Sequence, residues 1–259
     1  MSALDLFKLD DKVAIVTGGA KGIGLFYSEA LAEAGARVVM ADIDPKAVGE
    51  AGARLAEEHP GRVIGIELDV SSRSSIEAMV AEVGARWGRL DILVNNAAVF
   101  SVLPSRPSAW EIADEEWDQV MAVNVRGVYA CTEVCLDLMK RDAYGRVINI
   151  ASGLAFKGSP ALIHYAASKG AVVNLTRSMA TELGPAGITV NAIAPGATDS
   201  PTVLAQRAAR GLTARRSQRI LDRDEVPADL LGTLIYLSSP ASEFVTGQTI
   251  VVDGGSYLH

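Results

Sequence analysis

Short apolar runs, many of them rich in β-branched residues, alternate with helix-like segments along almost the whole chain. The first run, VAIVTG at 13–18, leads into a segment with helical periodicity that ends at Gly35. Strands that alternate with helices form parallel sheets with right-handed crossovers and helices on both faces. The sequence therefore predicts an α/β fold with a doubly wound, parallel, seven-stranded sheet. The strand candidates lie at 13–18, 37–42, 62–70, 90–96, 146–152, 188–195 and 249–255.

The segments between these runs predict helices and one irregular stretch. A polar stretch after the sixth strand, about 198–226, has no clear periodicity and is expected to form a variable lid over a substrate. After the first helix, further helices are expected through about Glu58, from Ser72 to Trp87, near Glu115 to Lys140, near Ala161 to Leu183 and near Pro227 to Leu237.

The chain has 259 residues, 49% of them hydrophobic, and no linker-like stretch divides it, so one domain over 1–259 is expected. No run approaches ~20 apolar residues, and the start lacks the basic-then-apolar order of a signal peptide. A cytoplasmic protein without a membrane partner is therefore expected. The net charge of -7 disfavours nucleic acid as a partner. The spacing of the Cys and His residues does not match a metal site.

A glycine-rich turn, TGGAKGIG at 17–24, follows the first strand. Without side chains, a phosphate can approach the backbone N–H groups, and the next helix adds partial positive charge. Asp42 ends the second strand, where a carboxylate can accept hydrogen bonds from an adenosine ribose. The pair predicts a dinucleotide, and Asp42 favours NAD over NADP, although Lys21 could pair with a 2′-phosphate. Taken alone, the glycine-rich turn could be a tight turn that binds no ligand, and Asp42 could be a solvated residue at a strand end.

Tyr165 and Lys169 are four residues apart in IHYAASKGAV, so they share one face of the expected helix. Hydride transfer to or from an alcohol carbon needs a group that moves the alcohol proton. Tyrosine has a pKa of about 10, and a neighbouring cation favours its phenolate. Ser152 follows the fifth strand at the carboxyl edge of the sheet, where its hydroxyl can hydrogen-bond a substrate oxygen. A core Tyr beside a Lys and a helix-capping Ser are the alternatives.

Several motifs in this order resemble the short-chain dehydrogenase/reductase family over nearly the whole length. The resemblance implies a one-domain Rossmann-like oxidoreductase that uses NAD(P) and is often a homotetramer. The sequence departs from the family pattern at Ala98, in place of Gly, and at Ser200, where a Thr often contacts the nicotinamide. The motifs are TGGAKGIG at 17, LDV at 68, NNAA at 95, VNVRG at 123, the Ser152–Tyr165 spacing, YxxxK at 165, NAIAPG at 191 and VDGG at 252.

The resemblance also implies roles for individual residues. Asn124 would complete a proton relay with Lys169, although an amide that ties its helix to a neighbouring strand is the alternative. The implied catalytic residues are Asn124, Ser152, Tyr165 and Lys169. The predicted cofactor contacts are Gly18, Lys21, Gly22, Ile23, Gly24, Asp42, Asp69, Val70, Asn96, Ala97, Tyr165, Lys169, Pro195, Gly196 and Thr198.

The expected substrate contacts are Ser152, Tyr165 and a mostly apolar wall, which favours a small hydrophobic secondary alcohol or ketone. Arginines between Thr202 and Arg223 suggest the alternative of a 3-oxoacyl thioester reductase that uses NADPH. A non-catalytic cofactor-binding regulator is a second alternative. The wall candidates are Phe100, Val102, Leu103, Leu154, Phe156 and Leu162, and the arginines are Arg207, Arg210, Arg215, Arg216 and Arg219.

Overall fold

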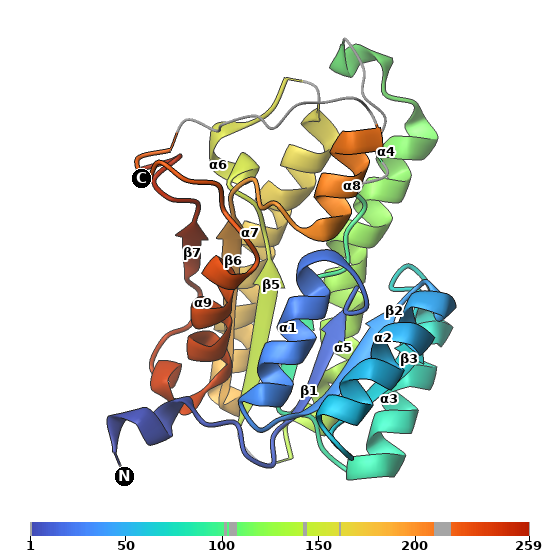
Figure 1. The fold of residues 1–259 in the computed structure, drawn as a ribbon, viewed down its shortest axis with the longest axis vertical. Coiled ribbons are helices and arrows are strands. Elements are labelled where there is room, and N and C mark those ends of the chain that lie inside the picture. The colour runs from blue at the N-terminus through green and yellow to red at the C-terminus, as the bar shows by residue number, and fades with distance from the viewer. Residues whose placement is uncertain are drawn as a thin grey trace.

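The computed structural model describes residues 2–100, 103, 108–141, 144–160, 162–209 and 219–258. Within them, seven parallel strands form one sheet in the order β3-β2-β1-β4-β5-β6-β7 (Figure 1). The strand order therefore reverses between β1 and β4, and the predicted doubly wound sheet is confirmed. The strands are β1 Val13–Thr17, β2 Arg37–Asp42, β3 Val63–Glu67, β4 Ile92–Asn95, β5 Gly145–Ile150, β6 Ile188–Pro195 and β7 Thr249–Val252.

Helices cover both faces of this sheet, as its buried strands require. Helices α1, α2 and α9 pack on one face, whereas α3, α5 and α7 pack on the other. No helix among the described residues is long and apolar enough to cross a bilayer. The helices are α1 Gly22–Glu33, α2 Pro45–Glu58, α3 Arg73–Trp87, α4 Asp114–Met121, α5 Gly127–Met139, α6 Leu154–Lys157, α7 Ile163–Leu183, α8 Pro201–Ala209 and α9 Ala228–Ser238.

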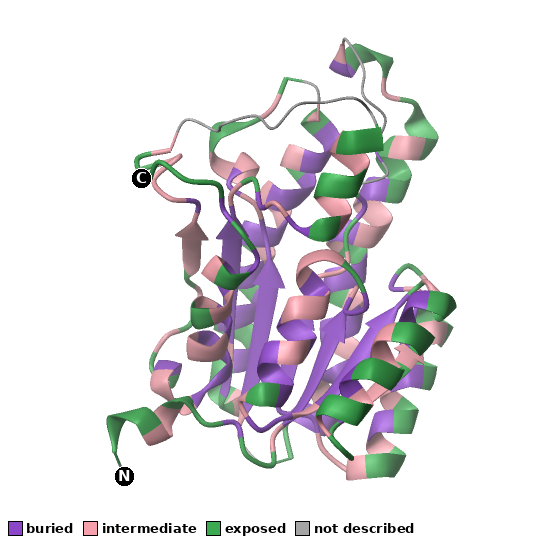
Figure 2. Ribbon diagram, viewed as in Figure 1, coloured by how far each residue is buried: buried purple, intermediate pink, exposed green. Residues whose placement is uncertain are grey.

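Strand β1 shows why the sheet needs two helical layers. All five of its residues are buried, and successive side chains point to opposite faces of the sheet. Ala14 and Val16 join the core beneath α1, α2 and α9, while Val13 and Ile15 join the core beneath α3, α5 and α7. The strands in the centre of Figure 2 are accordingly buried throughout.

The structure differs from the sequence prediction at three helices. The helix expected near Glu115–Lys140 contains a π-helical turn at Ala122–Arg126, between α4 and α5. The short helix α6 was not predicted, and α8 lies in the stretch expected to be irregular. Helix α8 has alternating exposure and no fully buried residue, which explains its weak sequence signal.

A buried chain of polar side chains joins the middle of the sheet to α5 and α7. The Asn95 amide on β4 donates to Asn149 Oδ1 on β5 at 2.9 Å and to Thr132 Oγ1 on α5 at 3.1 Å. The Asn149 amide in turn donates to Thr176 Oγ1 on α7 at 3.0 Å. Because buried donors are costly to leave unpaired, these bonds fix α5 and α7 relative to the strand ends.

We expect Thr176→Val to lower the free energy of unfolding by about 1–3 kcal/mol, because the buried Asn149 amide loses its acceptor. Urea denaturation measures the change. Thr181 is the matched control, since it lies on the same helix and its hydroxyl also bonds a carbonyl one turn back, but it is exposed. Thr181→Val should change stability by less than about 0.5 kcal/mol. Equal losses in the two variants would contradict a structural role for the buried chain.

Candidate active site

The turn between β1 and α1 has glycines where side chains do not fit. Gly18 and Gly22 have φ angles of 61° and 54°, which residues with a side chain rarely adopt. A Cβ on Gly24 would lie 2.0 Å from the carbonyl oxygen of Gly18, and a Cβ on Gly18 would lie 2.9 Å from the Cα of Ala97. The Asn96 amide donates to the Gly18 carbonyl at 2.9 Å and braces the turn. The first turn of α1 leaves backbone N–H groups for a phosphate.

Asp42 lies beside this turn, as predicted for a ribose contact. It ends β2 and is 8% exposed, and its two carboxylate oxygens accept the backbone N–H groups of Ala20 and Asp44, both at 3.2 Å. Lys21 forms an ion pair with Asp44. The hydrogen bond from Lys21 is the main cause that lowers the pKa of Asp44. The ammonium group that could favour a 2′-phosphate is therefore already paired with a carboxylate.

Ile23 was also predicted to contact the cofactor. It is the second residue of α1, and its side chain packs against the core. Its backbone N–H belongs to the first turn of the helix, where N–H groups have no partner within the helix. A contact from Ile23 to a phosphate is thus expected through the backbone alone.

Ser152, Tyr165 and Lys169 meet at the carboxyl end of the sheet. Tyr165 and Lys169 are buried on α7, with 7% and 3% of their surface exposed. Ser152 follows β5, and its hydroxyl is close enough to the Tyr165 phenol to lower the pKa of that phenol. Lys169 Nζ donates to the Ile150 carbonyl at 2.7 Å and lies 5.8 Å from the centroid of the Tyr165 ring. The described residues give an acceptor to one of its three N–H groups, which leaves two for a ligand such as a ribose diol.

In the protein without cofactor, burial opposes the predicted effect of Lys169 on Tyr165. Burial raises the pKa of Tyr165 to about 12, and the hydrogen bond with Ser152 opposes that rise without reversing it. Burial also lowers the pKa of Lys169 to about 8, because the charged ammonium is the form that loses hydration. The protein alone therefore keeps the phenol protonated at neutral pH and makes its neighbouring cation easier to neutralise.

Asn124 lies in the π-helical turn and is fully buried. Its Oδ1 accepts the Val99 N–H at 2.8 Å, and its amide donates to the Ser168 hydroxyl at 3.1 Å and to the Val99 carbonyl at 3.3 Å. The side chain thus ties the loop after β4 to α7, which is the alternative that the sequence left open. Because both amide N–H groups are used, a role in a proton relay would depend on its backbone and stays a prediction.

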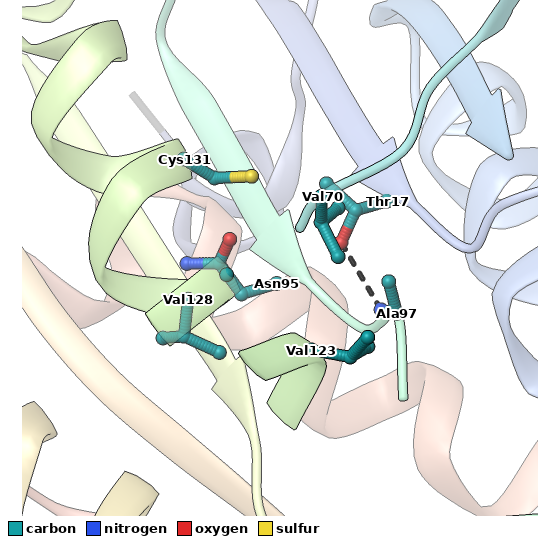
Figure 3. A pocket seen from close by; sticks show the side chains of 8 residues that line it. Thr17, Val70, Asn95, Ala97, Val123, Val128 and Cys131 are labelled. Carbon is teal, nitrogen blue, oxygen red and sulfur yellow. Dashed lines mark hydrogen bonds between the residues drawn. The ribbon is translucent and has the colours of Figure 1, made fainter. Parts of the chain in front are cut away.

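The residues predicted near adenine and ribose lie at the ends of β1, β3 and β4. Asp69 forms a turn in which Oδ1 accepts the Ser71 N–H at 2.8 Å, so that oxygen already has a partner. The Ala97 N–H donates to the Thr17 hydroxyl at 3.1 Å (Figure 3). This position is the switch point of the strand order, where doubly wound sheets bind ligands. A small pocket here is lined by Thr17, Val70, Asn95, Ala97, Val123, Gly127, Val128 and Cys131.

The predicted nicotinamide contacts Pro195, Gly196 and Thr198 lie at the end of β6 and in the turn that follows it. The Gly196 N–H donates to the Val252 carbonyl at 3.0 Å, which continues the pairing of β6 with β7. The Thr198 hydroxyl donates to Glu225 at 2.6 Å. The side chain of Thr198 is therefore engaged with the protein, which leaves its backbone for the predicted contact.

Four of the predicted wall residues lie close to or in one cluster with Tyr165. The rings of Phe100 and Tyr165 are 4.8 Å apart between centroids, and Leu154 packs in the same apolar cluster as Tyr165. Leu103 and Leu162 belong to that cluster too. Phe156 instead joins a different cluster, against Val172 and Val251 among others, and stacks on Tyr257. Val102 lies outside the described residues.

The predicted lid is described only in part. Arg207 on α8 pairs with Asp199, and Arg219 donates to the Ala197 carbonyl at 2.5 Å. Both guanidinium groups thus contact the turn after β6. Arg210, Arg215 and Arg216 lie outside the described residues.

Sequence reasoning missed Asp44, Asn149 and Glu225. The Asp-Pro pair at 44–45 is a typical helix start, and it could have indicated an acidic group facing the turn. Asn149 is a polar residue inside an apolar strand, which is a signal for a buried network. Glu225 has no local signal, because its partner Thr198 is far away in the sequence.

The fold, the glycine-rich turn with Asp42, and the Ser152–Tyr165–Lys169 group define an oxidoreductase that transfers hydride to or from a bound nicotinamide cofactor. A family model described as Enoyl-(Acyl carrier protein) reductase matches residues 18–257. The chain belongs to the short-chain dehydrogenase/reductase family.

Similar proteins cover nearly the whole chain. A 2-dehydro-3-deoxy-D-gluconate 5-dehydrogenase of Dickeya dadantii is 38% identical, covering 97% of this chain and 98% of its own. A 3-oxoacyl-[acyl-carrier-protein] reductase of Thermotoga maritima is 34% identical, covering 96% of this chain and 98% of its own. A solved short-chain type dehydrogenase/reductase from Mycobacterium marinum has a TM-score of 0.87 at 32% identity, with 100% of both chains covered.

The lowered pKa of Lys169 predicts a pH-dependent stability. The folded pKa of about 8 lies below the value of 10.5 for a free lysine, so between them the unfolded chain binds more protons and stability rises with pH. From pH 8 to pH 10, the unfolding free energy of the cofactor-free protein should rise by about 2 kcal/mol relative to Lys169→Met. Urea denaturation at both pH values, at fixed protein concentration, gives the difference. Parallel curves for the two proteins would contradict the shift.

Proposed function

We propose that the protein transfers hydride between NAD(H) and a small hydrophobic secondary alcohol or ketone, with Tyr165 as the acid/base. The observation that carries the proposal is the meeting of Ser152, Tyr165 and Lys169 beside an apolar wall at the carboxyl end of the sheet. Bound NAD⁺ would supply the hydride acceptor and a positive charge near the phenol.

In this proposal the three residues divide the work on the alcohol. The Ser152 hydroxyl orients the substrate oxygen and stabilises its developing charge. In the oxidation direction Tyr165, as phenolate, takes the alcohol proton while the carbinol hydrogen leaves as hydride; in the reduction direction its phenol returns the proton to the carbonyl oxygen. The Lys169 ammonium favours the phenolate and holds the nicotinamide ribose with its free N–H groups.

NAD is the proposed cofactor because two carboxylates control the adenosine end of the site. Asp42 would accept hydrogen bonds from the ribose and repel a 2′-phosphate. Asp44 neutralises Lys21, the nearby cation that would otherwise attract such a phosphate. The glycine-rich turn, α1 and the β6 turn would hold the pyrophosphate and the nicotinamide.

The proposed substrate class rests on the apolar surroundings of the reacting hydroxyl groups. Phe100, Leu103, Leu154 and Leu162 are close to or clustered with Tyr165. An apolar wall with few polar groups suits an alicyclic or aromatic alcohol. The Dickeya relative is named for a polar sugar acid, so a substrate panel must include hydroxylated acids.

A 3-oxoacyl thioester reductase is the second candidate, and the Thermotoga relative is named for that reaction. The two candidate arginines that the structure describes turn toward the β6 turn rather than outward. The acidic adenosine end also disfavours NADPH. A regulator without catalysis would not need the Ser152–Tyr165–Lys169 group, so it ranks third.

We further propose a homotetramer in the cytoplasm. Exposed apolar side chains on α5 and after α9, Tyr129 at 53% and Phe244 at 104% exposure, support association through these surfaces.

The proposed reaction is tested by NADH absorbance with NAD⁺ and a panel of cyclic and aromatic secondary alcohols, hydroxylated acids and 3-hydroxyacyl thioesters. We expect turnover of the apolar alcohols. Tyr165→Phe should lower kcat by about 10²–10⁴-fold, because it removes the transferable proton, and leave NADH affinity nearly unchanged. NADH binding without turnover of any substrate would favour the regulator, and full activity in Tyr165→Phe would remove Tyr165 from the mechanism.

The two carboxylates give a test of cofactor preference. Asp42→Ala should shift the preference toward NADP. Asp44→Asn should tighten NADP binding by up to about fivefold with little change for NAD, because it releases Lys21 while Asn still caps α2. Glu50→Gln is the matched control, since Glu50 pairs with Lys46 on the same helix. Titration of each cofactor gives the affinities; equal shifts for NAD and NADP in Asp44→Asn would rule out the release of Lys21.

A further inference from the structure

The turn after β6 packs closely against a buried carboxylate, that of Glu225, which lies near the end of the predicted lid. A Cβ added to Gly196 would lie 2.5 Å from Glu225 Oε2 and 2.9 Å from the Asp253 side chain. Glycine is therefore required at 196 so that the turn can pack against Glu225. Glu225 itself is 4% exposed, although glutamate is almost never fully buried without a partner.

Glu225 bonds to the turn through both its side chain and its backbone. The Thr198 hydroxyl donates to Glu225 Oε1 at 2.6 Å, and the Asp199 N–H donates to the Glu225 carbonyl at 2.7 Å. Thr198 and Glu225 also form an isolated parallel β-bridge. A carboxylate only accepts hydrogen bonds, so the Thr198 proton points to Glu225 and the backbone of residue 198 is fixed between them.

Arg219 completes the contact from the same segment. Its guanidinium donates to the Ala197 carbonyl at 2.5 Å and lies 3.8 Å from Glu225 Oε2, with 3% of its side chain exposed. Three successive residues of the turn, 197 to 199, thus bond to two residues near the end of the predicted lid, Arg219 and Glu225.

The carboxylate is costly in this position, which separates its role from simple stabilisation. Burial raises the pKa of Glu225, and this effect outweighs the opposing hydrogen bond from Thr198 and the charge of Arg219. A buried charge that is poorly stabilised adds little to folding. Its clearest structural effect is the conformation of the turn.

We propose that Glu225 is a positioning residue that, through the Thr198 hydroxyl, holds the β6 turn in the shape that receives the nicotinamide end of the cofactor. This inference rests on the proposed function, because the turn is a cofactor contact only if the protein binds NAD(H). It gives the end of the predicted lid a direct part in cofactor binding, so a change at Glu225 would alter the affinity for the cofactor.

Titration of the full-length protein with NADH, followed by fluorescence, tests the proposal. Thr198→Val and Glu225→Leu each remove the hydrogen bond and should raise the Kd for NADH by up to about tenfold. The double variant should bind no more weakly than the weaker single variant, because both changes remove the same bond. Thr198→Ser keeps the hydroxyl and should restore a Kd within about twofold of the unaltered protein. Asp224→Asn, an exposed acid next to Glu225, is the matched control and should not change the Kd.

The kinetic pattern separates positioning from a general structural defect. The KM for NAD⁺ should rise in Thr198→Val, whereas the KM for the alcohol at saturating NAD⁺ should stay the same. Effects of Thr198→Val and Glu225→Leu that multiply in the double variant, or a Thr198→Val protein with unchanged Kd, would overturn the inference. Where Glu225→Leu does not fold, the comparison of Thr198→Val with Thr198→Ser decides it. An unaltered protein that binds no NADH would instead overturn the proposed function itself.

Discussion

The hydrogen bond between the Lys169 ammonium and the Ile150 carbonyl is the interaction on which the site depends. It attaches α7 to the end of β5 at the point where Ser152 follows, and so it brings the hydroxyl groups of Ser152 and Tyr165 together. A single carbonyl is a weak partner for a buried ammonium, which is why burial lowers the pKa of Lys169 to about 8. The described residues hold the Lys169 ammonium in place but give only one of its three N–H groups an acceptor.

The two N–H groups of Lys169 without an acceptor among the described residues suggest how ligand binding could change the acidity of the Tyr165 phenol. Burial raises the pKa of Tyr165 to about 12, so the protein alone does not form a phenolate at neutral pH. A ligand that gives the Lys169 ammonium two more acceptors would stabilise its charged form, and the charged form in turn favours the phenolate. In the proposed mechanism, cofactor binding and phenol acidity are thus linked through one side chain, a link that the sequence spacing alone does not reveal.

The sequence predicted the sheet well because the signals for it are local. The apolar runs of β1 and β5 are buried on both faces, and glycines mark the turn where Cβ atoms clash with the backbone. The position of Asp42 next to that turn could be predicted because it ends a strand there, and its ribose contact stays a prediction. The same reasoning could not assign Asn124, because its hydrogen bonds depend on a π-helical turn that has no pattern in the sequence. Phe156 was predicted in the substrate wall, but it packs in another cluster and stacks on Tyr257, a contact that the sequence does not indicate.

The contacts that complete the site come from residues far apart in the chain. Thr198 and Glu225 lie near opposite ends of the variable segment, and Lys21 and Asp44 are separated by a whole helix and strand. In both pairs a charged group fixes the geometry or charge of a cofactor-facing turn without itself belonging to a family motif. Because the end of the variable segment bonds to the β6 turn, a substitution there that alters the substrate pocket would also shift this turn. Substrate choice and cofactor affinity are therefore expected to vary together when residues 219–225 change.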